Sequence, residues 1–210
     1  MPGFRGVDYL NIDLMLSEEE LLVRQTARQF VDEEVTPIIK DCFNEGRFPS
    51  HLIRKMGELG FLGANLTGYG CAELSNVEYG LVMQEIERGD SGLRSFASVQ
   101  GALVMYPIHT FGSDEQKEKW LPRLQSGEAV GCFGLTEPGF GSNPGGMTTT
   151  AKQDGAGWVL NGEKTWITNG CAADVAVVWA RTEEGIRGFL VEKGTPDRKS
   201  TRLNSSHRIR

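Results

Sequence analysis

The sequence predicts an α+β protein, in which an all-helical N-terminal domain is followed by an incomplete antiparallel β-domain. Two observations predict this order. Apolar residues recur at three- and four-residue spacing up to about residue 128, which is the period of helices packed on a core. Short apolar runs separated by glycine-containing turns follow and stop near Lys193. We therefore expect a helical domain over residues 1–128 and part of a β-domain over residues 129–196.

Three capping-box patterns predict where helices begin. In this pattern a serine side chain accepts a hydrogen bond from the backbone three residues on, and a Glu or Gln there reaches back to the serine N–H. The pattern occurs at residues 17–20, 75–78 and 113–116. Pro37 fits the end of the first helix or the start of the next, and Gly60 fits the C-terminal end of a short helix.

Further strand signals follow residue 147. Asn161-Gly162 is a strong signal for a two-residue hairpin turn, so residues 158–160 and 164–168 are expected to pair as its two strands. An almost continuous apolar run predicts a strand buried on both faces at residues 175–179. Two further strands are expected, at residues 148–153 and 188–191.

Composition and charge exclude several classes of protein. No run of about 18 apolar residues is present, so no helix is expected to span a membrane. Of the formal net charge of −6, residues 197–210 contribute +4, which leaves −10 on residues 1–196 and argues against a nucleic-acid binder. The four cysteines form no Cys-x-x-Cys pair, and no histidine has metal-ligand spacing, so no metal is expected. Free thiols and the lack of a signal-peptide core indicate the cytoplasm, or the mitochondrial matrix in a eukaryote.

Residues 197–210 are expected to be a non-native, disordered tail. The segment DRKSTRLNSSH at residues 197–207 matches the in-frame translation of a common short-read sequencing adapter at all eleven residues. The hypothesis is that the natural sequence ends near Pro196; the alternative is a basic arm for an acidic partner. Amplifying the gene from source DNA tests this, and a native reading frame for these residues would contradict it.

The segment FGLTEPGFGS at residues 133–142 is the most informative functional signal. Its glycines and proline exclude a helix, so we expect a strand that opens into a loop whose backbone N–H groups approach a ligand. A dinucleotide motif is excluded, because Pro144 stands where Gly-x-Gly-x-x-Gly requires glycine. A second segment, KTWITNG at residues 164–170, adds an aromatic ring and two hydroxyls. Taken alone, the first segment could be an ordinary loop and Trp166 a core residue.

Arg94 is the only formally charged residue between Ser91 and Ser113. A guanidinium in so apolar a segment is costly to bury unless it is paired. One interpretation is an internal ion pair with Glu87, on the same helical face, or with Asp90. The other is a receptor for an anionic substrate group, because the planar guanidinium binds a carboxylate with two hydrogen bonds. The residues alone leave both open.

Three blocks of sequence together resemble the acyl-CoA dehydrogenases over nearly all of residues 9–196. The blocks CFGLTEP and TWITN, at residues 132–138 and 165–169, are similar to the flavin-binding signature of the family. The block EIERGDSGLRS at residues 85–95 resembles the members that act on glutaryl-CoA. The resemblance implies FAD as the cofactor and an acyl-CoA as the substrate.

The resemblance also implies roles for individual residues. Phe133, Leu135 and Thr136 would hold the flavin through backbone and hydroxyl contacts, in a loop that includes Gly141. Trp166 would pack on the isoalloxazine ring, and Thr168 would hydrogen-bond near its reactive edge. Ser142 would contact the cofactor or the CoA arm. The next residue departs from the family, which usually has Asp where this chain has Asn143.

For the substrate, the resemblance implies that Arg94 receives the distal carboxylate of glutaryl-CoA, assisted by Ser95 and oriented by Glu87. The implied reaction converts glutaryl-CoA to crotonyl-CoA and CO₂, in a homotetramer that passes electrons to an electron-transfer flavoprotein. The family's catalytic glutamate lies in a C-terminal helical domain, so no catalytic residue is assigned here, and Glu137 is not expected to be the base. The alternatives are a short-chain acyl-CoA dehydrogenase for an uncharged acyl group and a non-catalytic fragment or binding module.

Overall fold

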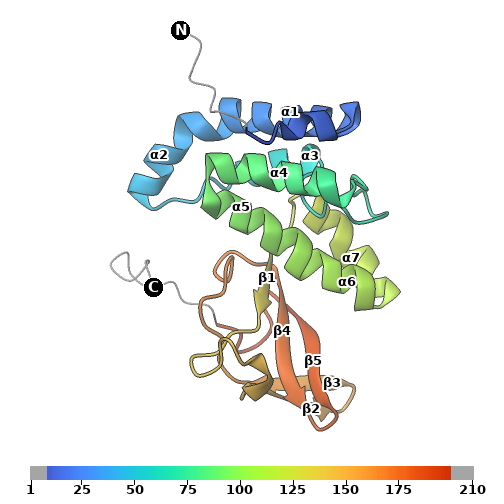
Figure 1. Cartoon of the computed structure of the whole chain (residues 1–210). Helices are drawn as coiled ribbons and strands as arrows, with labels where there is room; N and C mark the ends of the chain where they lie inside the picture. Colours follow the sequence, from blue (N-terminus) through green and yellow to red (C-terminus); the bar gives the residue numbers. More distant parts are fainter. Residues whose placement is uncertain (1–8, 200–210) are drawn as a thin grey trace.

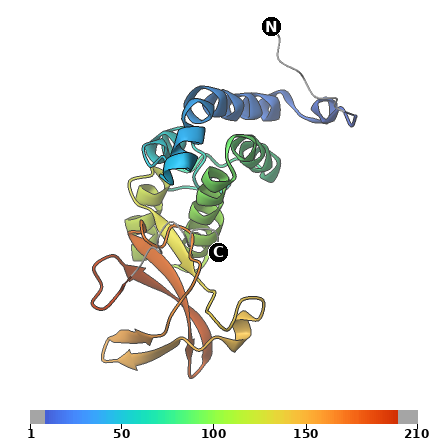
Figure 2. The ribbon, with the colours of Figure 1, turned by 90° about the vertical axis from the view of Figure 1, so that its left-hand side faces the viewer.

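A computed structural model describes residues 9–199 and shows a helical layer stacked on a small sheet (Figure 1). The view turned by 90° shows the same two layers (Figure 2). The helical elements are η1 (Ile12–Met15), α1 (Glu18–Phe30), η2 (Val31–Val35), α2 (Thr36–Glu45), α3 (Leu52–Glu58), α4 (Asn76–Gly89), α5 (Ser91–Ser98), η3 (Val99–Met105), α6 (Tyr106–Phe111) and α7 (Asp114–Gln125). They are followed by β1 (Gly131–Gly134), η4 (Pro144–Gly146), β2 (Thr150–Asp154), β3 (Gly157–Asn161), β4 (Val175–Thr182) and β5 (Gly185–Glu192).

The predicted helix starts are confirmed. Ser17, Ser75 and Ser113 each cap a helix, and in all three boxes both reciprocal hydrogen bonds are present. Pro37 lies in the first turn of α2, where its missing N–H costs nothing. Gly60 follows α3 with φ +74°, a conformation that favours glycine.

The apolar stretch after residue 90 forms α5, η3 and α6 in succession, and η3 is a π-helix. Asp90 separates α4 from α5 with extended backbone angles, and its carboxylate caps α5 by accepting a hydrogen bond from Leu93 N at 2.6 Å. A π-helical segment is rare and frequently marks a functional site. η3 also contacts the sheet closely, because a Cβ on Gly131 of β1 would lie only 2.4 Å from Val104 Cγ1.

The sheet is mixed, which corrects the purely antiparallel arrangement that we expected. β2–β3 and β4–β5 are antiparallel pairs, whereas β1 runs parallel to β4 from Gly131↔Val175 to Gly134↔Val178. Local turn signals predict hairpins but carry no information about this long-range pairing.

The predicted hairpin around Asn161-Gly162 is wrong. The partner of β3 is β2, and residues 164–168 form an irregular loop. The cause lies in a long-range contact: Lys164 turns away from β3 and donates hydrogen bonds to Leu135 O and Glu137. The predicted strands at residues 148–153, 175–179 and 188–191 correspond to β2, β4 and β5.

Only part of the predicted tail is described. Arg198 donates hydrogen bonds to Val191 O at 2.9 Å and to Ala173 O at 3.1 Å, so it packs on the β-domain, contrary to the expectation of disorder at this residue. Residues 200–210 lie outside the described residues. Within residues 9–199, no helix is long and apolar enough to cross a membrane, and no group of His, Cys, Asp and Glu could hold a metal ion. The four cysteines are free.

Candidate functional site

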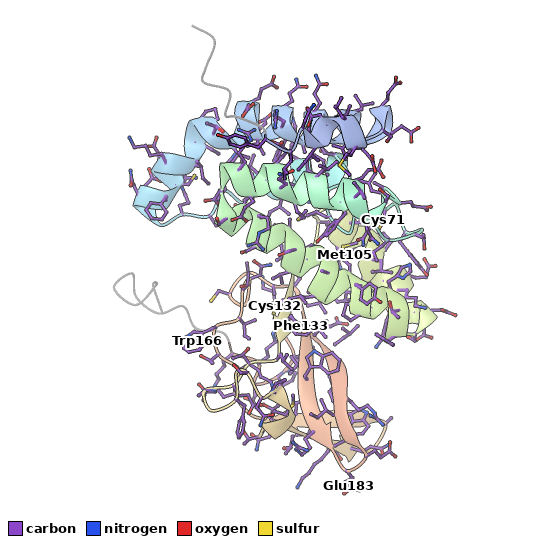
Figure 3. All side chains as sticks on the ribbon, in the orientation of Figure 1. Cys71, Met105, Cys132, Phe133, Trp166 and Glu183 are labelled. Carbon is purple, nitrogen blue, oxygen red and sulfur yellow. The ribbon has the colours of Figure 1, made fainter. Side chains whose placement is uncertain are left out.

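A cavity of about 280 Å³ lies between the helical layer and two loops of the β-domain. Five residues of the predicted flavin site line it, namely Phe133, Leu135, Thr136, Trp166 and Thr168. Val99, Leu103 and Ile167 complete the lining. Figure 3 shows Phe133 just below the helical layer and Trp166 on the loop beside it. The fold therefore brings together two segments that lie about 30 residues apart in the sequence.

Phe133 reaches the cavity from an edge strand. β1 pairs only with β4 among the described strands, so its other edge has no strand beside it. Backbone groups on such an edge can bind a ligand instead of a neighbouring strand. Close by, Thr165 N donates to Thr136 O at 2.9 Å, which joins the loop after β1 to the loop that carries Trp166.

Trp166 has a strained backbone and an exposed ring. Its φ is +56°, which is an outlier for a bulky side chain, and the residue is 71% exposed. Backbone strain of this kind persists only where the surroundings enforce it, and it gathers at ligand sites. An exposed indole in a strained loop argues against the interpretation of Trp166 as a core residue.

A buried ion pair holds the two loops together. Lys164 Nζ lies 2.8 Å from Glu137 Oε1 and 3.0 Å from Leu135 O. Glu137 also accepts hydrogen bonds from Thr148 N, at 2.6 Å, and from Thr149 N, at 2.9 Å. Burial acts to raise the pKa of Glu137, but the hydrogen bonds from Lys164, Thr149 and Thr148 outweigh it and hold the pKa far below its usual value. A carboxylate so fully engaged is a poor general base.

Gly141 and Ser142 lie outside the cavity. Both are exposed on the loop after β1, and neither lines the space between Phe133 and Trp166. Asn143, the departure from the family pattern, is exposed beside them. The flavin contacts predicted for Gly141 and Ser142 therefore stay predictions.

Arg94 is paired and half-exposed. Its Nε donates to Glu87 Oε2 at 2.5 Å, and its side chain is 36% exposed. The pair bridges two helices rather than one helical face, because the chain breaks at Asp90. The hydrogen bond from Arg94 lowers the pKa of Glu87. Arg94 Nη1 lies 3.3 Å from Ser98 Oγ, and within residues 9–199 no hydrogen bond engages Nη2. Arg94 therefore keeps donors for a ligand while its charge is balanced.

Arg94 and the predicted Ser95 lie close to the cavity along the chain. Ser95 is half-buried on α5, four residues before Val99, so the two lie on one helical face. Val99 is also the residue after Ser98 and lines the cavity. Neither Arg94 nor Ser95 lines the cavity itself, so their contacts with the substrate stay predictions.

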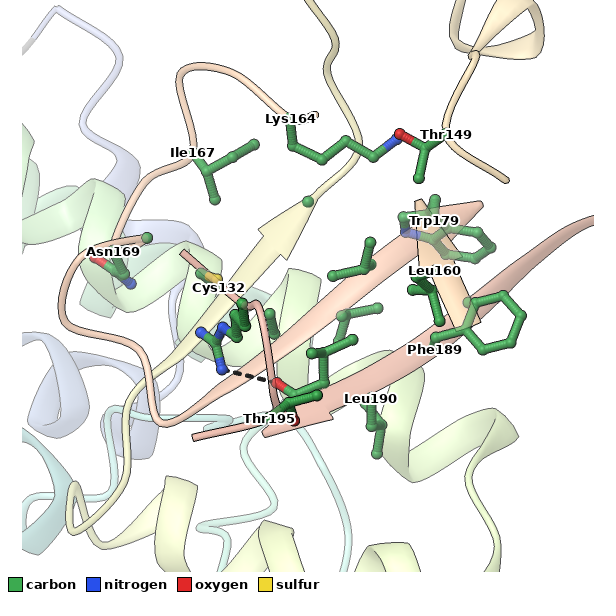
Figure 4. Close-up of a pocket in the computed structure, with 18 of the residues that line it drawn as sticks. Cys132, Thr149, Leu160, Lys164, Ile167, Asn169, Trp179, Phe189, Leu190 and Thr195 are labelled. Atoms are coloured by element: carbon green, nitrogen blue, oxygen red, sulfur yellow. Dashed lines mark hydrogen bonds between the residues drawn. The ribbon is translucent and has the colours of Figure 1, made fainter. Parts of the chain in front are cut away.

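A second hollow, of about 2480 Å³, opens over the sheet. Figure 4 shows Trp179, Phe189 and Leu190 on this face, with Lys164 and Thr149 at one side. Its volume exceeds the roughly 300–1,000 Å³ of ordinary ligand pockets. Its lining runs from the sheet to the loop at residues 162–172 and to Phe96 and Phe111 of the helical layer. Trp166, Ile167 and Thr168 line both spaces.

Comparison of the sequence with known protein families identifies the family of this chain. The sequence profile of "Acyl-CoA dehydrogenase, N-terminal domain" matches residues 17–128, and that of "Acyl-CoA dehydrogenase, middle domain" matches residues 132–209. The chain belongs to the acyl-CoA dehydrogenase family.

Solved structures and curated relatives agree with this membership. The chain resembles a glutaryl-CoA dehydrogenase from Mycobacterium smegmatis with 53% identity and a TM-score of 0.92, covering 94% of this chain and 51% of that one. A structure of a glutaryl-CoA dehydrogenase from the same organism, in complex with FADH2, has 55% identity and a TM-score of 0.87, with 89% and 48% covered. The mitochondrial short-chain specific acyl-CoA dehydrogenase of Bos taurus is 40% identical over 92% of this chain and 48% of its own length. The chain therefore spans about half the length of these relatives.

Sequence reasoning missed four contributors to the site. Val99 and Leu103 line the cavity, and their four-residue spacing after Ser95 could have placed them on one helical face. Ile167 lies between two predicted site residues. The sequence predicts Lys164 in a strand, and no local signal connects it with Glu137.

Proposed function

We propose that this protein is the flavin- and substrate-binding half of an FAD-dependent acyl-CoA dehydrogenase that oxidises glutaryl-CoA and releases CO₂ and crotonyl-CoA. The observation that carries the proposal is the meeting of Phe133, Thr136, Trp166 and Thr168 around one cavity, whose helical wall includes Val99, five residues after Arg94 in the chain.

The cavity fits a flavin ring. Its lining combines two aromatic rings, aliphatic side chains and two threonine hydroxyls, and the adjoining β1 edge offers backbone groups. Phe133, Leu135 and Thr136 would hold the ring through backbone and hydroxyl contacts, Trp166 would pack on it and Thr168 would hydrogen-bond near its reactive edge. Bound there, the flavin supplies the hydride acceptor for α,β-dehydrogenation.

Arg94 supports a substrate with a distal carboxylate. Among residues 9–199 no hydrogen bond engages its Nη2, which can donate to that group while Glu87 fixes the guanidinium through Nε. Ser95 would add a hydroxyl from the same helix. A neutral acyl chain would leave the exposed guanidinium without a partner from the substrate, so it gains nothing from Arg94.

The α-proton must be taken by a base that the described chain does not supply. Glu137 is engaged by Lys164 and the backbone, so the proposal assigns this step, as the resemblance implies, to the C-terminal helical domain of a full-length protein. We also propose the homotetramer, the electron-transfer flavoprotein as electron acceptor, and a cytoplasmic or mitochondrial-matrix location.

The second candidate is a short-chain acyl-CoA dehydrogenase for an uncharged acyl group, which the 40% identity to the bovine enzyme favours. Measuring turnover and CO₂ release with glutaryl-CoA and butyryl-CoA in a full-length version separates the two. The proposal expects CO₂ and a preference for glutaryl-CoA. Oxidation of butyryl-CoA with no CO₂ from glutaryl-CoA would support the second candidate instead.

A further inference from the structure

We propose that Gln100 and Asn169 are positioning residues that set the width of the cavity between η3 and the loops. Neither residue lines this cavity, and both act on it through the peptide groups of Gly131. This inference rests on the proposed flavin site. It assigns a function to two polar side chains that, within residues 9–199, make no hydrogen bond to the predicted flavin residues or to Arg94.

Gln100 is fully buried in η3, next to Val99 of the cavity wall. Its Nε2 donates to Leu124 O at 2.9 Å and to Ala129 O at 2.8 Å, and its Oε1 accepts from Gly131 N at 2.8 Å. Both amide protons and the amide oxygen are thus satisfied, which fixes the orientation of the side chain. Gln100 therefore ties the helical wall to the first residue of β1.

Asn169 ties the opposite wall to the same residue. Its Nδ2 donates to Gly131 O at 3.2 Å. Its backbone has φ +66°, and its own carbonyl accepts from Ala172 N and Ala173 N, each at 2.9 Å. Asn169 directly follows Thr168, so its position determines where the loop with Trp166 returns to the sheet.

Gly131 joins these two contacts with little freedom. No side chain fits there, because a Cβ would lie 2.4 Å from Val104 Cγ1. Each peptide group is planar, and the pairing of Gly131 with Val175 of β4 fixes the strand. A shift of η3 is therefore passed to the loop with Trp166. Binding sites must be held within about 0.5 Å, so such a link is expected to matter for flavin affinity.

The test uses a full-length version of the protein. Each substitution is made on one wall of the cavity, and its effect is measured by NMR at a residue of the other wall. Gln100→Met removes all three side-chain hydrogen bonds at similar volume, and Asn169→Gly keeps the left-handed backbone while removing Nδ2. Gln125→Met is the matched control, because Gln125 donates to Gly57 O at 3.0 Å elsewhere in the helical layer. The readouts are the Kd for FAD, fluorine NMR of fluorotryptophan at Trp166, and methyl NMR of Val99.

We expect Gln100→Met to move or broaden the Trp166 resonance and Asn169→Gly to move the Val99 methyl resonances. Each should raise the Kd for FAD by about 2- to 13-fold, which corresponds to a displaced wall weakening the flavin's contacts by the equivalent of one hydrogen bond. The control should leave these signals and the Kd unchanged. If the variants fold and the Trp166 and Val99 resonances stay unchanged, the proposed link between the two walls is overturned. If Gln100→Met does not fold, the Val99 methyl resonances of Asn169→Gly decide whether the two walls are linked.

Absence of FAD binding in the unsubstituted protein would contradict the proposed function, not the link. The NMR readouts do not need the cofactor, so the link between the two walls is tested either way.

Discussion

Lys164 Nζ lies 2.8 Å from Glu137 Oε1, and this ion pair joins the two loops that form one side of the cavity. Both side chains are largely buried, at 10% and 2% exposed. Leu135 O takes a further hydrogen bond from Lys164, so the pair also fixes the strand end that leads into the cavity. The predicted flavin wall is thus held by two residues that do not line the cavity.

Lys164→Met should destabilise the protein strongly. It leaves the Glu137 carboxylate buried without its cation, which costs about 3–5 kcal/mol. Urea unfolding measures this loss. Lys55→Met is the control, because Lys55 pairs with Glu34 at 3.0 Å with both side chains exposed. A loss no greater than that of the control would show that the buried pair is unimportant.

Acid should destabilise the protein partly through Glu137. Because its folded-state pKa lies below the ordinary value of 4.5, the unfolded chain takes up a proton more readily as the pH falls. The stabilisation is present above that ordinary value and is lost as the pH drops toward the folded-state pKa. Urea unfolding over about pH 3 to 7 should therefore show a shallower acid dependence in Glu137→Gln. Parallel pH profiles would contradict this.

Trp166→Ala should weaken FAD binding without unfolding the protein. The ring is 71% exposed, so little packing is lost, whereas aromatic stacking contributes about 0.5–1.5 kcal/mol, or roughly 2- to 13-fold in Kd. FAD titration of a full-length version measures it. Trp158→Ala is the control, since Trp158 is half-exposed on β3 and does not line the cavity of about 280 Å³. Equal losses in both variants would argue against a specific contact.

Local features of the fold could be predicted from the sequence, and long-range ones could not. The capping boxes at Ser17, Ser75 and Ser113 are complete within four residues, so their signals needed no tertiary information. The hairpin predicted from Asn161-Gly162 does not form, because the distant contacts of Lys164 outweigh the local turn preference. Parallel pairing of β1 with β4 has no local signature.

The candidate site shows the same division. Phe133, Thr136, Trp166 and Thr168 could be predicted from the resemblance, and the structure brings them to one cavity. The role of Gln100 could not be predicted from the sequence. A buried glutamine in an apolar helix is recognised only from the three backbone groups that it bonds. For Arg94 the sequence left two interpretations, and the geometry accommodates both. Its Nε pairs with Glu87 while Nη2 remains available within the described chain.

The most direct test of the account is the ratio of kcat/KM for glutaryl-CoA to that for butyryl-CoA in a full-length version, with and without Arg94→Ala. A charge-assisted hydrogen bond to the distal carboxylate is worth about 1.5–3 kcal/mol, so the ratio should fall by about 10- to 150-fold. The ratio for Arg94→Lys should lie between those of the unsubstituted protein and Arg94→Ala, because lysine keeps the charge but lacks the planar guanidinium. An unchanged ratio in a folded, flavin-loaded Arg94→Ala protein would contradict the assignment of Arg94 to the substrate carboxylate.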